Sequence, residues 1–341
     1  MHIASLYIHP IKSLLPVAVQ SAQLTALGLA HDRTFVLLRA ATGEPLHIGR
    51  LLRLCLFAVA LSDDSSSSNT GVSSSSTMTV TFTPTGDTLR LPLVPAKLGG
   101  PVEVVMHGSA CTGHRVSTTA DTFFSAHLGF AATLVFLGAS RRRVLGNLPS
   151  PPPGPDSNSS WYGLGFGFRG QQNQPEITFA DCAPLLVTTT PSLAEVSARC
   201  SCDIDTRKFR PNIVVAPGPH HPEGPGGADG GASEGPTEGG EEAVQPFEED
   251  YWAEITITPP GTDVGTPARG HRVQLTANCA RCNSINVDFA TGSTVAPAVQ
   301  PLKKLMGDRR VDAGMKFSPI FGRYGFVAGM PLCPSGVRLC A

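Results

Sequence analysis

Residues 279–284 read Cys279-Ala280-Arg281-Cys282-Asn283-Ser284 and are the most informative stretch of this 341-residue chain. Its two cysteines stand three residues apart, with an arginine between them. A thiolate is a soft ligand for a transition metal, and an adjacent guanidinium favours the thiolate and can also bind a phosphate. An oxo-metal cofactor with a phosphate tail would use both properties. A zinc site would need a second pair of ligands, and a disulfide would not need the arginine.

The sequence around this stretch predicts a mainly β protein of the α+β class. Short runs rich in Val, Leu, Thr and Phe are bounded by Gly, Pro, Asp or Ser, as strands of barrels and sandwiches are. The predicted strands cover residues 3–8, 18–24, 34–39, 54–61, 78–83, 88–93 and 102–106. Helices are fewer, and capping and spacing predict them at residues 118–128, 191–196 and 301–306.

Three segments of low complexity interrupt this pattern. Residues 63–76 are mostly serine, residues 149–160 are proline and serine, and residues 217–242 are rich in Gly, Pro and Glu. They carry too little apolar surface to offset the entropy of ordering them, so we predict that they are disordered. We use the second as a linker, which gives a β-barrel-like domain over residues 1–148 and a second β-barrel domain over residues 161–341.

Composition narrows the class of protein. Hydrophobic residues make up 41% of the chain and the mean hydropathy is +0.04, so a large core can form. The formal net charge of -1 and the pI of about 6.8 argue against broad electrostatic binding of nucleic acid. Nine irregularly scattered cysteines do not fit a secreted disulfide framework. We find no signal peptide and no transmembrane segment, and expect a soluble intracellular protein, cytoplasmic or associated with mitochondria.

Cations and polar side chains also stand at the ends of apolar strands. There they can supply donors for phosphate and oxo-anions. The amide of Asn212 can donate and accept at the edge of a heteroaromatic ring, and Asp181 is a candidate acceptor for ring N–H groups or a partner for an arginine. The candidate binding residues are Lys12, Ser13, Arg33, Asp181, Arg210, Asn212 and Arg281.

These segments together resemble the MOSC superfamily, and more closely the mitochondrial amidoxime reducing components and their bacterial relatives. The resemblance follows the family's order and covers nearly all of the chain outside the low-complexity segments. It rests on Tyr7-Ile8-His9-Pro10-Ile11-Lys12-Ser13, Asp32-Arg33, Phe179-Ala180-Asp181, Phe209-Arg210-Pro211-Asn212, Cys279-Ala280-Arg281-Cys282 and Phe317-Ser318-Pro319-Ile320-Phe321-Gly322-Arg323-Tyr324-Gly325.

The resemblance implies a MOSC N-terminal β-barrel domain over residues 1–148, a MOSC domain over residues 161–341, and a molybdenum cofactor (Mo-molybdopterin) held between them. Cys282 matches the cysteine that ligates the metal and is therefore the implied catalytic residue. The seven candidate binding residues match positions that contact or lie near the pterin or its phosphate. The implied activity is reduction of N-hydroxylated small molecules, such as amidoximes, hydroxylamines and N-oxides. Electrons would come from a cytochrome b5-type protein and its reductase.

Two other functions stay open. The chain could be a sulfur carrier or cofactor-handling protein with a persulfide on Cys282, although no aminotransferase-like domain that would bind pyridoxal phosphate is attached. It could also be a binding module without activity that retains the barrel. The family usually has threonines after the second cysteine, where this chain has Asn283-Ser284. The resemblance therefore does not define the substrate face, and membrane anchoring is not carried over.

Overall fold

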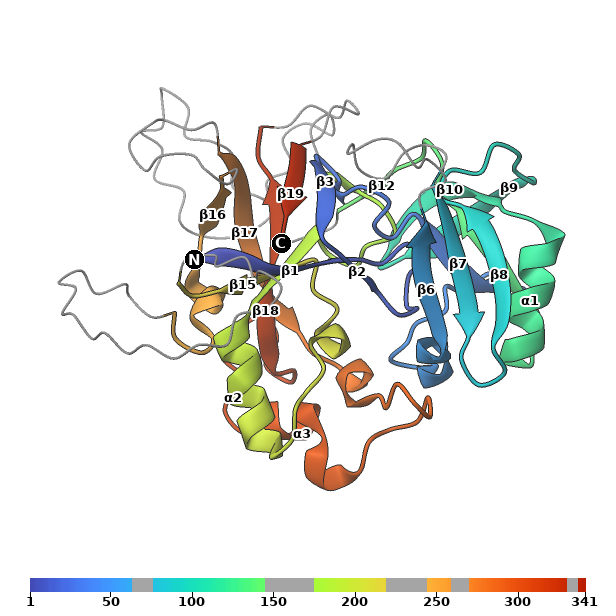
Figure 1. Ribbon diagram of the computed structural model, residues 1–341. Coiled ribbons are helices and arrows are strands. Elements are labelled where there is room, and N and C mark those ends of the chain that lie inside the picture. The colour runs from blue at the N-terminus through green and yellow to red at the C-terminus, as the bar shows by residue number, and fades with distance from the viewer. Residues whose placement is uncertain (63–75, 145–174, 219–243, 259–269, 330–336) are drawn as a thin grey trace, which may run out of the picture.

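The computed structural model describes residues 1–62, 76–144, 175–218, 244–258, 270–329 and 337–341. Most regular structure in these residues is β-strand, with few helices, so the predicted fold class is confirmed. Two groups of strands lie side by side in Figure 1. One contains the longest sheet and both chain ends, and the other contains β6 to β10 and helix α1.

The longest sheet has seven strands and joins the two ends of the chain. Its order is β16 (Glu254–Ile257), β17 (His271–Ala280), β18 (Ile320–Val327), β14 (Leu185–Thr189), β15 (Ile213–Ala216), β1 (His2–Ile8) and β2 (Val17–Val19). Strands β14 and β15 are parallel, and the other neighbours are antiparallel. Because β1 pairs with β15, the first strand belongs to a sheet made mostly by the C-terminal half of the chain.

A smaller sheet adds a second link between the chain ends. Strand β3 (Ser21–Thr25) lies between β4 (Gly28–Leu29) and the last strand, β19 (Val337–Cys340). The predicted strand over residues 18–24 is therefore divided, because β2 pairs with β1 while β3 pairs with β19 and β4.

The N-terminal group of strands surrounds its own core. One sheet has the order β5 (Phe35–Arg39), β11 (Ala132–Phe136), β10 (Ser109–Arg115) and β9 (Pro101–Met106), and another joins β6 (Phe57–Ser62), β7 (Thr77–Phe82) and β8 (Asp87–Pro92). Alternate side chains of β7 are buried, as the period of a strand with one covered face requires. They meet Phe57 and Phe124 in a cluster of aromatic rings, which anchors α1 (Thr118–Leu128) on the strands.

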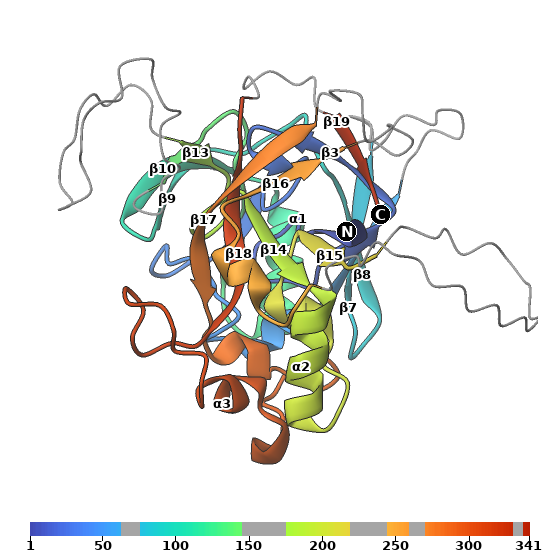
Figure 2. The same cartoon turned by 90° about the vertical axis from the view of Figure 1, so that its left-hand side faces the viewer.

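The three predicted helices are confirmed. In α1 the Ser117 hydroxyl accepts from the Ala120 N–H at 3.1 Å, and Gly129 ends the helix with a positive φ of 79°. Thr189 caps α2 (Thr190–Cys200) in the same way, and α3 (Pro301–Leu305) begins at a proline. Figure 2 shows α2 and α3 together at one end of the molecule, where Val196 and Leu305 share a buried cluster.

Short segments complete the described fold. Strands β12 (Arg142–Arg143) and β13 (Glu176–Ile177) pair with each other. The 3-10 turns are η1 (Leu52–Leu56), η2 (Thr206–Phe209), η3 (Glu248–Tyr251), η4 (Asn283–Asn286) and η5 (Pro297–Val299). The predicted strand over residues 54–61 begins late, at Phe57, because η1 occupies the residues before it.

The predicted linker at 149–160 lies outside the described residues, as do nearly all of the predicted insertions at 63–76 and 217–242. Ser76 is an exception: it is fully buried, and its carbonyl accepts from the Leu93 N–H at 3.0 Å. Among the described helices, none has both the length and the apolar character needed to span a membrane.

Candidate functional site

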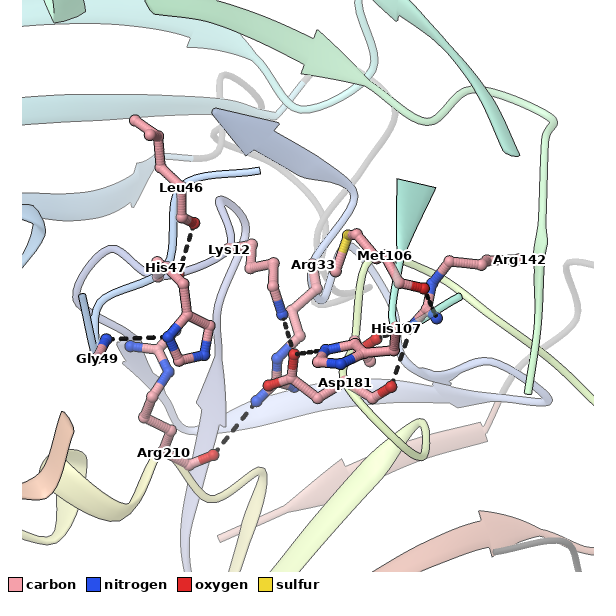
Figure 3. A network of polar contacts seen from close by, with 12 residues as sticks. Lys12, Arg33, Leu46, His47, Gly49, Met106, His107, Arg142, Asp181 and Arg210 are labelled. Atoms are coloured by element: carbon pink, nitrogen blue, oxygen red, sulfur yellow. Dashed lines mark hydrogen bonds and ion pairs between the residues drawn. The ribbon is translucent and has the colours of Figure 1, made fainter. Parts of the chain in front are cut away.

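The predicted binding residues converge because their strands are neighbours in the seven-stranded sheet. Lys12 and Ser13 follow β1, Asp181 precedes β14, and Arg210 and Asn212 precede β15. These turns lie at the side of the sheet that faces the N-terminal strands, and Figure 3 shows several of their side chains in one polar network.

Asn212 is fully buried, and protein groups bond both polar atoms of its side chain. Its Oδ1 accepts from Arg33 Nη1 at 3.1 Å and from the Leu186 N–H at 3.1 Å, while its Nδ2 donates to the Tyr7 carbonyl at 3.3 Å. The amide therefore ties β1 to β14 next to the site. A heteroaromatic ring would have to compete for atoms that are already bonded.

Arg33 lies at the centre of the network. Its guanidinium forms a buried ion pair with Asp32, donates to Asn212, and donates from Nη2 to the Arg210 carbonyl at 3.3 Å. Asp32 in turn accepts from the His9 N–H at 2.7 Å. The pair links the turn after β1 to the turn before β15, so it fixes the relative positions of other cations.

Asp181 is hydrogen-bonded to two basic side chains at the partly exposed side of the network. Its Oδ1 accepts from Lys12 Nζ and from His107 Nε2, the latter at 2.9 Å. Burial alone would raise the pKa of Asp181, but the Lys12 charge and the His107 hydrogen bond outweigh it and hold the pKa well below its usual range. Asp181 is therefore a carboxylate at neutral pH. It neutralises Lys12 and leaves the other cations to face a ligand.

Arg210 carries donor capacity that the described protein does not use. Its Nη1 donates to the Leu14 carbonyl at 2.9 Å, but its Nη2 is buried and has no hydrogen-bond partner in the described part of the chain. Burial and the nearby Arg33 charge lower the pKa of Arg210 to about 10, so it stays charged at neutral pH. A buried guanidinium with an unsatisfied donor is costly, which favours an anion at this point.

The charges of the cluster add to this argument. Lys12, Arg33 and Arg210 are cations, and the two carboxylates bonded to them are Asp32 and Asp181, which leaves one positive charge in excess. Burial lowers the pKa of His9 well below its usual value, with help from the arginines, so its ring stays neutral. The cluster therefore matches a buried anionic group such as a phosphate.

Backbone strain concentrates at the same place. Non-glycine residues with positive φ are uncommon and tend to gather where function over-determines the backbone. Ser13, His31, Arg33, His107 and Arg210 all have φ between 49° and 73°. Four of them stand in the turns that carry the predicted site, and His107 bonds to Asp181.

Arg281 is hydrogen-bonded to backbone carbonyls on two segments. Its Nε and Nη2 donate to the Phe321 carbonyl, and its Nη1 donates to the Phe209 carbonyl at 2.7 Å. The guanidinium also lies over both rings, 5.4 Å and 5.8 Å from their centroids. Arg281 therefore locks the strand that leads to Cys282 against the turn before Arg210.

The two cysteines of the opening stretch have different environments. Cys279 is buried, its Sγ donates to the Tyr324 hydroxyl at 3.0 Å, and burial raises the pKa of its thiol. Cys279 is therefore a packing residue. Cys282 is exposed, and its Sγ lies 3.3 Å from the Ser284 hydroxyl. Of the two, Cys282 is the thiol that a ligand can reach.

Sequence reasoning missed His47, Gly49 and His107. A Cβ added at Gly49 would lie 3.3 Å from Cys282 Sγ and 3.0 Å from His47 Nδ1, so this loop forms a wall beside the exposed thiol. The Gly49 N–H donates to His47 Nδ1 at 3.0 Å, as Figure 3 shows. Burial lowers the pKa of His47, and the charges of Asp181, Lys12 and Arg210 also act on it, so His47 is coupled electrostatically to the cationic cluster.

Comparison with known proteins shows which proteins this chain is similar to. Residues 1–130 match the family described as the MOSC N-terminal beta barrel domain. These residues are similar to a MOSC N-terminal barrel. The mitochondrial amidoxime-reducing component 1 of Mus musculus is 24% identical over 330 residues, covering 94% of this chain and 76% of that protein. The component 2 protein of Bos taurus is 23% identical, with 94% and 77% covered.

A further relative has a different name. The molybdenum cofactor sulfurase of Oryza sativa subsp. japonica is 24% identical over 323 residues, covering 91% of this chain but only 31% of that protein. Among solved structures, a Bordetella bronchiseptica protein shares 13% identity with a TM-score of 0.24 and covers 33% of this chain and 83% of that one. The chain thus matches the MOSC N-terminal beta barrel domain over its first 130 residues and is similar, at low identity, to amidoxime-reducing components over most of its length.

The MOSC N-terminal barrel supplies one side of the site. His47, Gly49 and His107 lie within residues 1–130 and belong to loops between its strands. Asp181, Arg210 and Cys282 come from the second half of the chain. No regular motif marks the first three, because the loop of His47 and Gly49 meets Cys282, and His107 meets Asp181, only when the two halves pack together.

Proposed function

We propose that this protein is a molybdenum-cofactor-dependent oxidoreductase that reduces N-hydroxylated compounds, such as amidoximes, hydroxylamines and N-oxides. One observation carries the proposal: an exposed thiol, Cys282, is connected through the loop of His47 and Gly49 to a buried cationic cluster with an unsatisfied Arg210 donor. A thiol ligand beside an anion site is what a metal cofactor with a phosphate tail requires.

The described residues fit such a cofactor better than a bare metal ion. Within the described ranges, no group of three or more His, Cys, Asp or Glu side chains could hold a metal by itself. One thiolate can still complete the coordination of a metal that arrives with its own sulfur ligands, as in a pterin dithiolene. Cys282 would supply that thiolate, while Arg210, whose Nη2 has no partner in the described part of the chain, would bind the phosphate.

The other predicted residues divide by what their side chains already do. Arg33, Asn212 and Arg281 are already hydrogen-bonded to protein groups, so we propose that they position the site and do not contact the cofactor directly. Ser13 donates to the Leu46 carbonyl at 3.2 Å and so holds the loop that leads to His47. Asp181 orients Lys12. All seven remain proposed cofactor-site residues, with direct contact to the phosphate assigned to Arg210.

The reaction needs two electrons and two protons for each N–O bond that is broken, and it releases water and the N-dehydroxylated product. The cofactor, when bound, supplies the two-electron chemistry. The described chain shows no cysteine cluster for iron and sulfur, so we propose that electrons come from an external one-electron carrier of the cytochrome b5 type and its reductase. Protein groups beside Cys282, such as the neutral His47, would orient the substrate oxygen.

A sulfur carrier is the second candidate. The similarity to a molybdenum cofactor sulfurase supports it, and so does the exposure of Cys282, because a persulfide must reach its acceptor. In that function Cys282 would hold sulfane sulfur and no metal would be required.

Two assays separate these functions. The protein, purified from a host that makes the cofactor, is tested for conversion of benzamidoxime to benzamidine with reduced methyl viologen as electron source. The same preparation is treated with cyanide, which releases thiocyanate from a persulfide. The proposal expects benzamidine and no thiocyanate, with activity lost in Cys282→Ser. The opposite result would be thiocyanate from the wild type but not from Cys282→Ser, with no benzamidine from either. That result would reject the reductase and support the sulfur carrier.

A further inference from the structure

The segment that follows α3 exposes apolar side chains next to the candidate site. Phe317 is 86% exposed, and Val311 and Met315 are each nearly half exposed. Large apolar side chains gathered on one short surface segment often mark a contact with another protein. We call residues 310–317 the Phe317 segment.

Both ends of this part of the chain are tied to the residues that flank Cys282. At one end the Leu302 N–H donates to Asn286 Oδ1 at 3.0 Å. At the other end the Arg281 N–H donates to the Pro319 carbonyl at 2.8 Å. The Phe317 segment therefore projects from a base that is attached on both sides of the exposed thiol. A protein seated on it would lie close to Cys282.

The exposed charges on α3 and on the Phe317 segment are mostly positive. The exposed cations are Lys303, Lys304, Arg310 and Lys316. The carboxylates among them are already engaged: Asp308 pairs with Arg199 at 2.7 Å, and Asp312 accepts from the Gly314 N–H at 2.8 Å. An apolar centre with a basic rim is complementary to a partner with an apolar contact surrounded by carboxylates.

We infer that the Phe317 segment is the docking surface for a small acidic electron-carrier protein. The inference rests on the proposed function, which needs external electrons but does not say where they enter. Phe317 is the apolar anchor, because exposed aromatic residues contribute most at protein interfaces. The four cations steer the approach of the acidic partner, which makes association dependent on ionic strength. Each docked carrier gives up one electron, so two docking events serve one turnover.

The test measures binding first and turnover second. A soluble cytochrome b5 haem domain is titrated into the purified full chain at low ionic strength, with wild type, Phe317→Ser and Lys316→Glu compared. Matched controls are Val105→Ser, an exposed apolar residue on β9, and Lys97→Glu, an exposed lysine of the N-terminal half. We expect each Phe317 segment variant to raise Kd about tenfold or more, the effect of losing a hot-spot side chain, with both controls unchanged.

Turnover separates this inference from the proposed function. Benzamidoxime reduction driven by the cytochrome should fall in Phe317→Ser and Lys316→Glu, while reduction driven by methyl viologen, a small donor that needs no docking surface, should not change. Equal binding in all five proteins, or no binding by the wild type, would overturn the docking surface. The cytochrome could also bind through the Phe317 segment while the protein shows no activity with methyl viologen. That result would support the docking surface and reject the proposed reductase function.

Discussion

Replacing Asn212 by leucine tests whether this predicted cofactor contact is a structural residue. The side chain is fully buried and makes three hydrogen bonds to protein groups. Leucine has a similar volume but cannot donate or accept. The substitution would leave the Leu186 N–H and the Tyr7 carbonyl without these partners, while Arg33 keeps its ion pair with Asp32.

The expected loss of stability follows from those two groups. A buried polar group left unsatisfied costs about 1–3 kcal/mol, so the free energy of unfolding should fall by about 2–6 kcal/mol. This is a large part of the usual total of about 5–15 kcal/mol. The measurement is urea denaturation of cofactor-free protein, followed by far-UV circular dichroism.

The control is Asn283→Leu, because Asn283 is exposed and contacts Asn286 alone among the side-chain bonds described. It should change the free energy of unfolding by less than about 0.5 kcal/mol. A change below about 1 kcal/mol in Asn212→Leu would refute the reasoning. It would show that the Asn212 amide is available to a ligand.

Three further predictions concern the thiol and its surroundings. Arg281→Lys should lower the free energy of unfolding by about 2–4 kcal/mol, because one ammonium cannot replace three bonds to two carbonyls; an unchanged urea midpoint would contradict this. Gly49→Ala should slow alkylation of Cys282 by iodoacetamide, read by mass spectrometry, whereas Gly100→Ala, with open space around it, should not. Asp181 has a lowered pKa, so it stabilises the fold above about pH 4 and loses this effect as the pH falls toward the folded pKa. The difference in melting temperature between wild type and Asp181→Asn should therefore be largest at neutral pH and shrink below about pH 4, and a constant difference would count against the Lys12 contact.

Local signals in the sequence were sufficient to predict the helices and most of the strands. The Ser117 cap and Gly129 define α1, and alternating burial defines β7, because both patterns depend on neighbours a few residues away. The division of residues 18–24 into two strands was not predictable in this way. It depends on pairing with β19 at the other end of the chain, and loop closure over that distance leaves no local pattern.

The predicted site residues do lie close together, but several of them are bonded to the protein itself and are not available to a ligand. Arg281 and Asn212 were chosen because guanidinium and amide groups suit a phosphate and a ring, yet both are bonded to backbone groups. The sequence shows which side chains can donate hydrogen bonds but not which acceptors they meet in the fold. It therefore could not distinguish Arg210, which has an unpartnered donor, from Arg281, which is bonded to carbonyls. His47 and His107 could not be found at all, since isolated histidines between strands carry no spacing signal.

The measurement that tests the central claim most directly is the molybdenum content of protein purified from a host that makes the cofactor, wild type beside Cys282→Ser and Cys279→Ser. The account predicts near-stoichiometric molybdenum in the wild type and in Cys279→Ser, and loss of molybdenum or of its catalytic competence in Cys282→Ser. Wild-type protein without molybdenum, or a Cys282→Ser variant that keeps both metal and benzamidoxime reduction, would contradict the assignment of Cys282 as the ligand of a molybdenum centre.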